Sequence, residues 1–342
     1  MYFTKSIFAL LFALVFFSSC EKEEPIEPTP SKLETMAIPM GSDYAKQCFF
    51  DLETKTIVAQ NDRWSWDLAF ESSADGYHIF LNSAKLMYAK NTGKKNFNQV
   101  YSYSYDQRTS KYDMPSGNPD STAIGEWGQK SAESVSTYGD VYIIDRGMDR
   151  NNQPIPPKKM IVQGLSNNTY NIRFADLDGS NEHEIAVPKN ADYNRIFLSL
   201  DGAGSLVQVE PAKDTWDLAF TMYTHIFYEA PSNIPLQVDT LPYLVNGVLL
   251  NQNGVMAARD TSIDFDSLMI SDADNFTYSD VANTIGYDWK SFEFDEENYV
   301  IDSKLHFVVK TVEGNVFKLR FTDFYDEQGI KGTPTFQFQQ LK

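Results

Sequence analysis

The chain has 342 residues, of which 47 are acidic and 29 are Lys or Arg, so its formal net charge at pH 7 is -18. This negative balance argues against nucleic acid or anionic lipid headgroups as partners. Apolar residues make up 42% of the chain and aromatic residues 14%, which is enough material for two ordinary domains that each bury a core.

The first 19 residues have the order of a secretory signal. Lys5 precedes an apolar run from Ile7 to Phe17, and small residues follow directly before Cys20. The run is too short to span a bilayer as a stable helix. A cysteine at this place resembles a bacterial lipobox, in which it becomes the lipidated first residue of the mature protein. We therefore predict a signal peptide over residues 1–19 and a lipid anchor on Cys20.

Residues 20–36 follow as an acidic, proline-rich tract that cannot bury enough apolar surface to fold. We predict a tether that lifts the globular part off the membrane. Lys22 and its acidic neighbours also resemble the signal that takes Bacteroidetes lipoproteins to the outer face of the outer membrane, although a solvated acidic linker is an alternative. The expected location is the outer membrane, lipid-anchored and facing the exterior. Cys48 is the only other cysteine, so no disulfide is expected within the mature chain.

The remainder of the chain contains an internal repeat. Residues Trp66–Phe70 return unchanged as Trp216–Phe220, and flanking segments recur in the same order about 150 residues later, which indicates a duplication. We predict a degenerate N-terminal domain over residues 37–192 and a C-terminal domain over residues 193–342. The other matched segments are Phe49–Leu52 with Phe197–Leu200, Ile57–Val58 with Leu206–Val207, Ile124–Trp127 with Ile285–Trp289, and Tyr170–Asp176 with Phe317–Asp323.

Strand patterns dominate both copies. Trp66, Leu68 and Phe70 alternate with smaller or polar residues, which is the period of a half-buried strand. Further short β-branched and aromatic runs are bounded by Gly, Asp and Asn, and no long helical period is present. The sequence predicts an all-β fold of two tandem sandwich-type domains. Asp67 and Asp217 are expected to hold a neighbouring turn by accepting backbone hydrogen bonds.

Two of the four histidines follow the repeated strand. We predict that His78 and His225 correspond, and that His225 lies on the strand face opposite Trp216, Leu218 and Phe220. An imidazole there could ligate iron, with Met222 or Met256 as a second ligand. The alternatives are an ordinary exposed strand histidine and a methionine that fills the core. No other metal site is expected.

Residues Pro242–Leu250 form an apolar segment with no counterpart in the first copy. It is either a finger that closes on a ligand or receptor, or a strand packed into the core. Because only the second copy has it, any binding surface is expected in the C-terminal domain. Motifs for nucleophilic, zinc-dependent or phosphate-binding enzymes are missing from the sequence, so we predict a protein that is not an enzyme.

These motifs together resemble the HmuY family of Bacteroidetes surface lipoproteins. The resemblance is strongest from Asn194 to Lys342, where Trp216–Phe220, Trp289, Phe317–Phe321 and Gly329–Phe336 stand at the places of the family pattern. It implies a heme-binding, hemophore-like protein. It does not supply a matched histidine pair, because Glu71 and Thr221 directly follow the repeated motif.

The resemblance predicts a surface lipoprotein that binds heme or a related porphyrin-like small molecule and passes it to an outer-membrane transporter, such as a TonB-dependent one. The candidate heme-binding residues are His225, Met222, Met256 and His78. The alternative from another class is a non-heme adhesion or scaffold subunit of a nutrient-uptake complex, which contacts glycan or protein through exposed aromatic residues.

Overall fold

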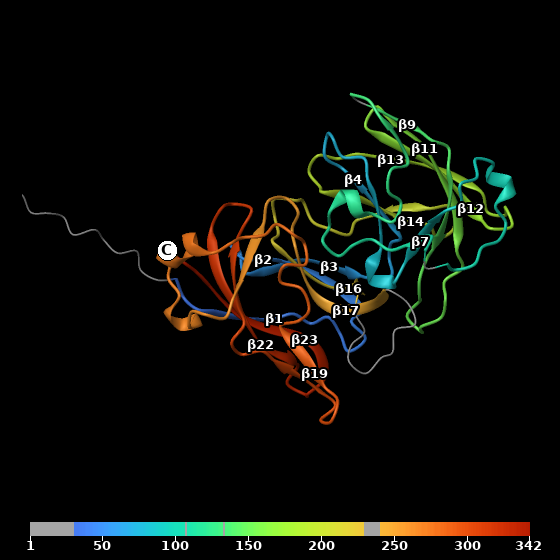
Figure 1. The fold of residues 1–342 in the computed structure, drawn as a ribbon. Coiled ribbons are helices and arrows are strands. Elements are labelled where there is room, and N and C mark those ends of the chain that lie inside the picture. The colour runs from blue at the N-terminus through green and yellow to red at the C-terminus, as the bar shows by residue number, and fades with distance from the viewer. Residues whose placement is uncertain (1–30, 107, 133, 229–239) are drawn as a thin grey trace, which may run out of the picture.

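The structure, a computed structural model, describes residues 31–106, 108–132, 134–228 and 240–342. Strands make up almost all of its regular structure, so the predicted all-β class is confirmed. Figure 1 shows two lobes that lie against each other. The predicted signal peptide, Cys20 and the first part of the predicted tether lie outside the described residues. The last residues of the predicted tether belong to a strand, Glu34–Ala37, that pairs with the C-terminal strand, so the tether ends earlier than predicted.

The terminal lobe contains the described parts of residues 31–62 and 211–342. A five-stranded sheet in the order β1-β23-β22-β21-β18 faces a four-stranded sheet in the order β17-β16-β2-β3. Phe50, Phe220, Phe307 and Phe336 meet in the core between them. Its elements are β1 (Glu34–Ala37), β2 (Lys46–Asp51), β3 (Thr56–Asp62), β16 (Leu218–Phe227), β17 (Leu241–Leu250), β18 (Met256–Asp260), η4 (Phe265–Ser267), η5 (Ile270–Asn275), β19 (Lys290–Glu293), β20 (Asn298–Ile301), β21 (His306–Lys310), β22 (Val316–Tyr325) and β23 (Lys331–Gln340).

The inner lobe contains the described parts of residues 63–210. A four-stranded sheet in the order β15-β14-β4-β5 faces an eight-stranded sheet. Phe70, Leu198, Tyr142 and Phe174 meet in its core. Its elements are β4 (Leu68–Glu71), β5 (Ile79–Leu81), η1 (Ser83–Lys85), β6 (Tyr88–Asn91), η2 (Phe97–Gln99), β7 (Ser110–Lys111), η3 (Pro119–Ser121), β8 (Gly128–Lys130), β9 (Val135–Thr137), β10 (Val141–Asp145), β11 (Lys158–Ser166), β12 (Thr169–Asp176), β13 (His183–Pro188), β14 (Arg195–Ser199) and β15 (Ser205–Val207).

Each predicted copy contributes its first hairpin to the lobe that contains the rest of the other copy. These hairpins are β2–β3 and β14–β15. β2, from the first predicted copy, pairs with β16 of the second, and Phe49 lies opposite Ala219. β14, from the second copy, pairs with β4 of the first, and Phe197 lies opposite Ala69. The predicted limits of 37–192 and 193–342 therefore do not enclose separate sheets. The duplication itself stays a prediction, which the matching positions of the two hairpins support.

The two repeated aspartates make the same backbone contact in both lobes. Asp67 Oδ2 accepts a hydrogen bond from the backbone N–H of Leu200 at 2.7 Å. Asp217 Oδ2 accepts one from the backbone N–H of Leu52 at 3.0 Å. The expected structural role of these carboxyl groups is confirmed, and each one fixes the end of the exchanged hairpin.

A third apolar cluster joins the lobes. The rings of Trp66 and Phe197 meet edge to face at 4.8 Å between centroids, and those of Phe49 and Trp216 do so at 4.9 Å. The ribbon of β16 and β17 adds a polar contact, because the Thr224 hydroxyl donates to the carbonyl oxygen of Ser83 at 2.7 Å. Pro242–Leu250, expected as either a finger or a core strand, lies in β17, where Val248 and Leu250 are in the core. It is one strand of a long ribbon that reaches the inner lobe.

Candidate functional site

His225 lies near the end of β16, where aromatic rings surround its imidazole. The Phe227 ring lies 4.7 Å away between centroids and the Tyr287 ring 5.0 Å away. Tyr243 of β17 is its partner in register. The imidazole is half-buried, and burial lowers the pKa of His225 below its ordinary value, against the opposing effect of Asp288. The ring is therefore neutral at pH 7, which is the form that ligates iron.

One nitrogen of this imidazole makes no hydrogen bond with the described residues. Nδ1 of His225 is buried and has no partner among the described residues. Buried polar atoms are nearly always paired in folded proteins. A neutral ring in contact with the Phe227 and Tyr287 rings suits a flat apolar ligand that carries an iron atom. Because Nδ1 is buried, the iron would bind the other nitrogen, Nε2.

The two candidate methionines do not join this site. Met222 lies three residues before His225 on the same strand, and alternation sends their side chains to opposite faces. Met222 is buried and lines a pocket between the lobes. Met256 begins β18 in the facing sheet, where it lies opposite Lys310. Neither methionine is therefore placed to share one iron atom with His225.

His78 does not occupy the place that corresponds to His225. In the inner lobe Leu81 of β5 lies opposite Leu68, and in the terminal lobe Leu250 of β17 lies opposite Leu218. Leu81 therefore corresponds to Leu250. His78 lies three residues before Leu81, so it corresponds to Gly247, which is on β17 and not on β16. The predicted correspondence of the two histidines is wrong, because β16 continues where β4 ends.

Each histidine is nevertheless covered by the matching Ile-Gly segment of its own lobe. Tyr287, from the segment Ile285–Trp289, contacts His225. Glu126, from the segment Ile124–Trp127, lies 3.7 Å from Nε2 of His78. The difference between these two residues makes one histidine site aromatic and the other acidic. Sequence reasoning found both segments but gave them no functional role.

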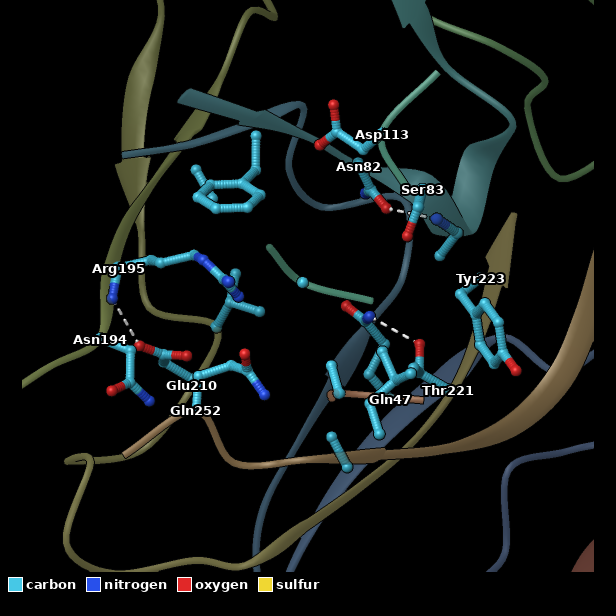
Figure 2. A pocket seen from close by; sticks show the side chains of 18 of the residues that line it. Gln47, Asn82, Ser83, Asp113, Asn194, Arg195, Glu210, Thr221, Tyr223 and Gln252 are labelled. Carbon is cyan, nitrogen blue, oxygen red and sulfur yellow. Dashed lines mark hydrogen bonds between the residues drawn. The ribbon is translucent and has the colours of Figure 1, made fainter. Parts of the chain in front are cut away.

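A pocket opens between the lobes, and Figure 2 shows its polar residues. Its volume is about 130 Å³, which is below the about 300–1,000 Å³ of typical ligand pockets. Gln47 donates to the hydroxyl of Thr221 at 2.8 Å, and the carboxyl group of Glu210 accepts from the backbone N–H of Arg195 at 2.7 Å. Burial raises the pKa of Glu210 to about 7. As it stands, this pocket is too small to enclose a porphyrin.

Among the described residues, none of the helices is both apolar and long enough to cross a bilayer.

Two solved structures align with most of this chain at low sequence identity. Apo PinO from Porphyromonas gingivitis is 12% identical, with 91% of this chain and 98% of that chain covered and a TM-score of 0.28. The apo HmuY analog TFO from Tannerella forsythia is 12% identical, with coverages of 92% and 99% and a TM-score of 0.23. TM-scores this low do not establish a shared fold. The search of curated proteins found no match.

The family comparison is the informative one. A family model described as HmuY protein matches residues 43–338. The match covers both lobes and does not begin near Asn194, where the sequence resemblance is strongest. One family unit therefore spans the exchanged hairpins and both sandwiches. The chain belongs to the HmuY family.

Proposed function

We propose that this chain is a surface-exposed lipoprotein of the outer membrane, anchored through Cys20, that binds heme or a related porphyrin-like ligand and passes it to an outer-membrane transporter. The observation that carries the ligand is the His225 site. There a neutral imidazole contacts the rings of Phe227 and Tyr287, and Tyr243 lies opposite His225 on β17. Family membership and the signal-like N-terminus support the remainder of the proposal.

The chemistry of the site fits a heme ligand in two ways. An imidazole nitrogen is a common axial ligand of heme iron. Aromatic side chains bury large flat surfaces and prefer offset or edge-to-face contacts. The Phe227 and Tyr243 rings lie 6.3 Å apart between centroids, and Tyr243 is more than half exposed, so a macrocycle can reach the rings from solvent.

A hemin titration tests the ligand. Purified protein with residues 1–19 removed is titrated with hemin while the Soret band is recorded. We expect a sharpened Soret band that saturates at one hemin per chain, and its loss in His225→Ala. His183→Ala is the matched control, because His183 is a half-buried strand histidine of the inner lobe. A wild-type spectrum identical to that of free hemin would remove heme from the proposal.

A second candidate function has its own observation. Phe292, Phe294, Tyr299 and Tyr325 line an open cavity of about 470 Å³ at the β19–β20 hairpin, and Phe294 is 71% exposed. Exposed aromatic patches commonly mark interaction sites. This surface favours an adhesion or scaffold role that contacts glycan or protein. Retrieval of a transporter complex that depends on Phe294, without any Soret signal, would favour this function over heme binding.

A further inference from the structure

The β19–β20 hairpin stands apart from the sheets of both lobes. Among the described strands, β19 and β20 pair with each other and with no third strand, and Figure 1 shows them at a projecting edge of the terminal lobe. At the base of the hairpin, Lys290 Nζ donates to the carbonyl oxygen of Asn246 at 2.8 Å. The hydroxyl of Tyr325 accepts the backbone N–H of Tyr299 at 2.6 Å. The base is therefore held in place, while the hairpin tip, residues 292–297, is exposed throughout.

Aromatic rings form a row along this hairpin. The Tyr299 ring packs on the buried Phe324 ring at 4.9 Å between centroids. Phe292 follows at 5.1 Å from Tyr299, and Phe294 at 5.2 Å from Phe292. The exposed fraction rises along the row, to 39% at Phe292 and 71% at Phe294. Burying an exposed phenylalanine contributes about 1.5–3 kcal/mol, so the hairpin tip offers apolar surface that a partner can bury.

Carboxylates without cations lie beside the exposed rings. The hairpin tip contains four acids, and in the part of the chain that the structure describes none of them forms an ion pair. They are Glu293, Asp295, Glu296 and Glu297. Glu297 lines the same open cavity as Phe292 and Phe294, and Lys331 is the cation among the lining residues. The charge around the rings is therefore negative on balance, and such a surface attracts positively charged partners.

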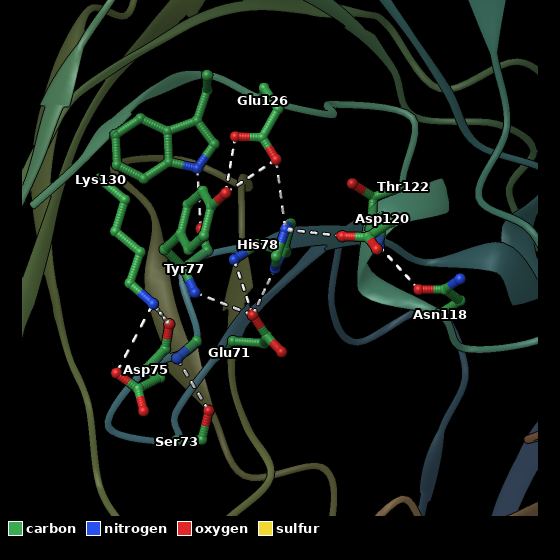
Figure 3. A network of polar contacts seen from close by, with 12 residues as sticks. Glu71, Ser73, Asp75, Tyr77, His78, Asn118, Asp120, Thr122, Glu126 and Lys130 are labelled. Atoms are coloured by element: carbon green, nitrogen blue, oxygen red, sulfur yellow. Dashed lines mark hydrogen bonds and ion pairs between the residues drawn. The ribbon is translucent and has the colours of Figure 1, made fainter. Parts of the chain in front are cut away.

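The corresponding hairpin of the inner lobe lacks this surface. β8–β9 follows Trp127 as β19–β20 follows Trp289, but β9 also pairs with β11 and so belongs to a large sheet. Residues 128–137 contain no aromatic side chain. Figure 3 shows that Lys130 of this hairpin is already engaged, because it donates to the carbonyl oxygen of Asp75 at 2.7 Å. The fold therefore does not require an exposed aromatic tip with unpaired carboxylates, which favours a function for the tip in the terminal lobe.

We propose that the hairpin tip docks a basic segment of a partner protein, in which Lys or Arg side chains flank an apolar side chain. The apolar side chain fills the open cavity beside Phe292 and Phe294, and the cations meet the carboxylates of the hairpin tip. The phenylalanine faces add to this attraction, because a cation over an aromatic ring is favourable. This docking site rests on the second candidate function, the adhesion or scaffold role, and gives that role its class of partner.

A glycan fits the hairpin tip less well than a basic segment does. The rings of Phe292 and Phe294 stand at 86° to each other, so they provide no shared flat platform for stacked sugars. Neutral sugars also leave the four carboxylates without cations. A basic segment uses both features of the tip, because it supplies the missing positive charges together with an apolar side chain.

Peptide selection on the purified protein tests the class of partner. A phage-displayed library of random peptides is selected on the chain with residues 1–19 removed, at physiological salt concentration. We expect the enriched peptides to combine Lys or Arg with apolar residues. A synthetic copy of the most enriched peptide is then titrated with the wild type and with variants, and its fluorescence anisotropy measures the affinity.

Two variants separate the apolar contribution from the charged one. Phe294→Ser is expected to weaken binding of this peptide about 10-fold or more, as the loss of a central aromatic contact does. Asp295→Asn combined with Glu296→Gln is expected to weaken binding and to reduce its dependence on salt concentration, because salt screens exposed charge pairs. All three side chains are exposed, so we expect both variants to fold as the wild type does.

Matched changes elsewhere on the surface are the controls. Tyr101→Ser removes an aromatic ring that is also 71% exposed but lies in the inner lobe. Asp274→Asn combined with Asp280→Asn removes two exposed carboxylates from the terminal lobe outside the hairpin tip. Both control proteins are expected to bind the peptide as tightly as the wild type.

The proposal is overturned if no basic peptides are enriched, or if the two tip variants bind the enriched peptide as tightly as the wild type. A glycan array probed with the same proteins separates this failure from failure of the scaffold role. Neutral glycans that bind the wild type but not Phe294→Ser, with no basic peptide enriched, would keep the adhesion role and exclude a basic partner.

Discussion

The two repeated aspartates have the same backbone contact but opposite electrostatic surroundings. Asp67 is buried with two cations: Lys85 Nζ and the guanidinium of Arg146, which lies 2.8 Å from Asp67 Oδ2. Burial alone would raise the pKa of Asp67, but these cations hold it below its ordinary value. Asp217 is equally buried and has Asp51 and Glu53 as neighbours in place of cations.

Asp67→Asn is expected to destabilise the protein by about 3–5 kcal/mol, because it leaves the buried ammonium of Lys85 without its carboxylate and leaves Arg146 with Asp201 alone. The free energy of unfolding from urea titration measures the loss. Asp217→Asn is the matched comparison and should cost less, because it leaves no buried cation behind. Equal losses in the two variants would contradict this electrostatic difference.

Asp217 makes stability depend on pH. Burial, together with Glu53 and Asp51, raises the pKa of Asp217 to about 8 from an ordinary value of 3.8. The folded chain then binds a proton that the unfolded chain releases, so this group's contribution to stability falls as the pH rises from about 4 to 8. We expect the unfolding midpoint to decrease from pH 5 to pH 8, and Asp217→Asn to reduce that decrease. An unchanged pH profile in the variant would contradict the raised pKa.

At the scale of elements, the sequence predicts strands better than their partners. Alternation in Trp66–Phe70 and Trp216–Phe220 marks β4 and β16, and the structure has strands at Leu68–Glu71 and Leu218–Phe227. The partners β14 and β2 come from more than a hundred residues away. Period-two patterns determine which face of a strand is buried, but they do not determine which strand lies beside it.

The histidine sites show the same limit. The short similarity around His78 and His225 predicts equivalent positions, yet one histidine precedes β5 and the other lies within β16. The length of a strand depends on what it pairs with, and β17 extends the pairing of β16 along ten residues. The chemical difference between the sites was visible in the sequence as Glu126 against Tyr287, but only the fold shows that these residues cover the imidazoles.

The β16–β17 ribbon fits closely against the segment that carries Tyr287. A Cβ at Gly247 would lie 2.5 Å from the carbonyl oxygen of Gly286, which is backbone and cannot rotate away. Gly247→Ala is therefore expected to cost about 1–3 kcal/mol in the free energy of unfolding. Hemin affinity should fall as well, because Gly286 directly precedes Tyr287. Stability and affinity equal to the wild type would show that this segment does not hold Tyr287 in place.

At the scale of the whole molecule, the two lobes belong to one family unit and share an apolar cluster. The family match spans residues 43–338, the hairpins are exchanged, and Trp66, Phe197, Phe49 and Trp216 bury a shared cluster. Composition and the internal repeat predict two sandwiches, and two facing pairs of sheets are present. The shared cluster could not be predicted, because the half-apolar faces of β4 and β16 look the same whether they meet solvent or another lobe.

The proposed heme site requires the His225 imidazole to ligate the iron of a bound heme. Chemical rescue measures this most directly, by recording the Soret band of hemin with His225→Gly before and after imidazole is added. We expect the variant to lose the sharpened band and free imidazole to restore it. A Soret band in His225→Gly equal to that of the wild type, without added imidazole, would show that His225 does not ligate the iron.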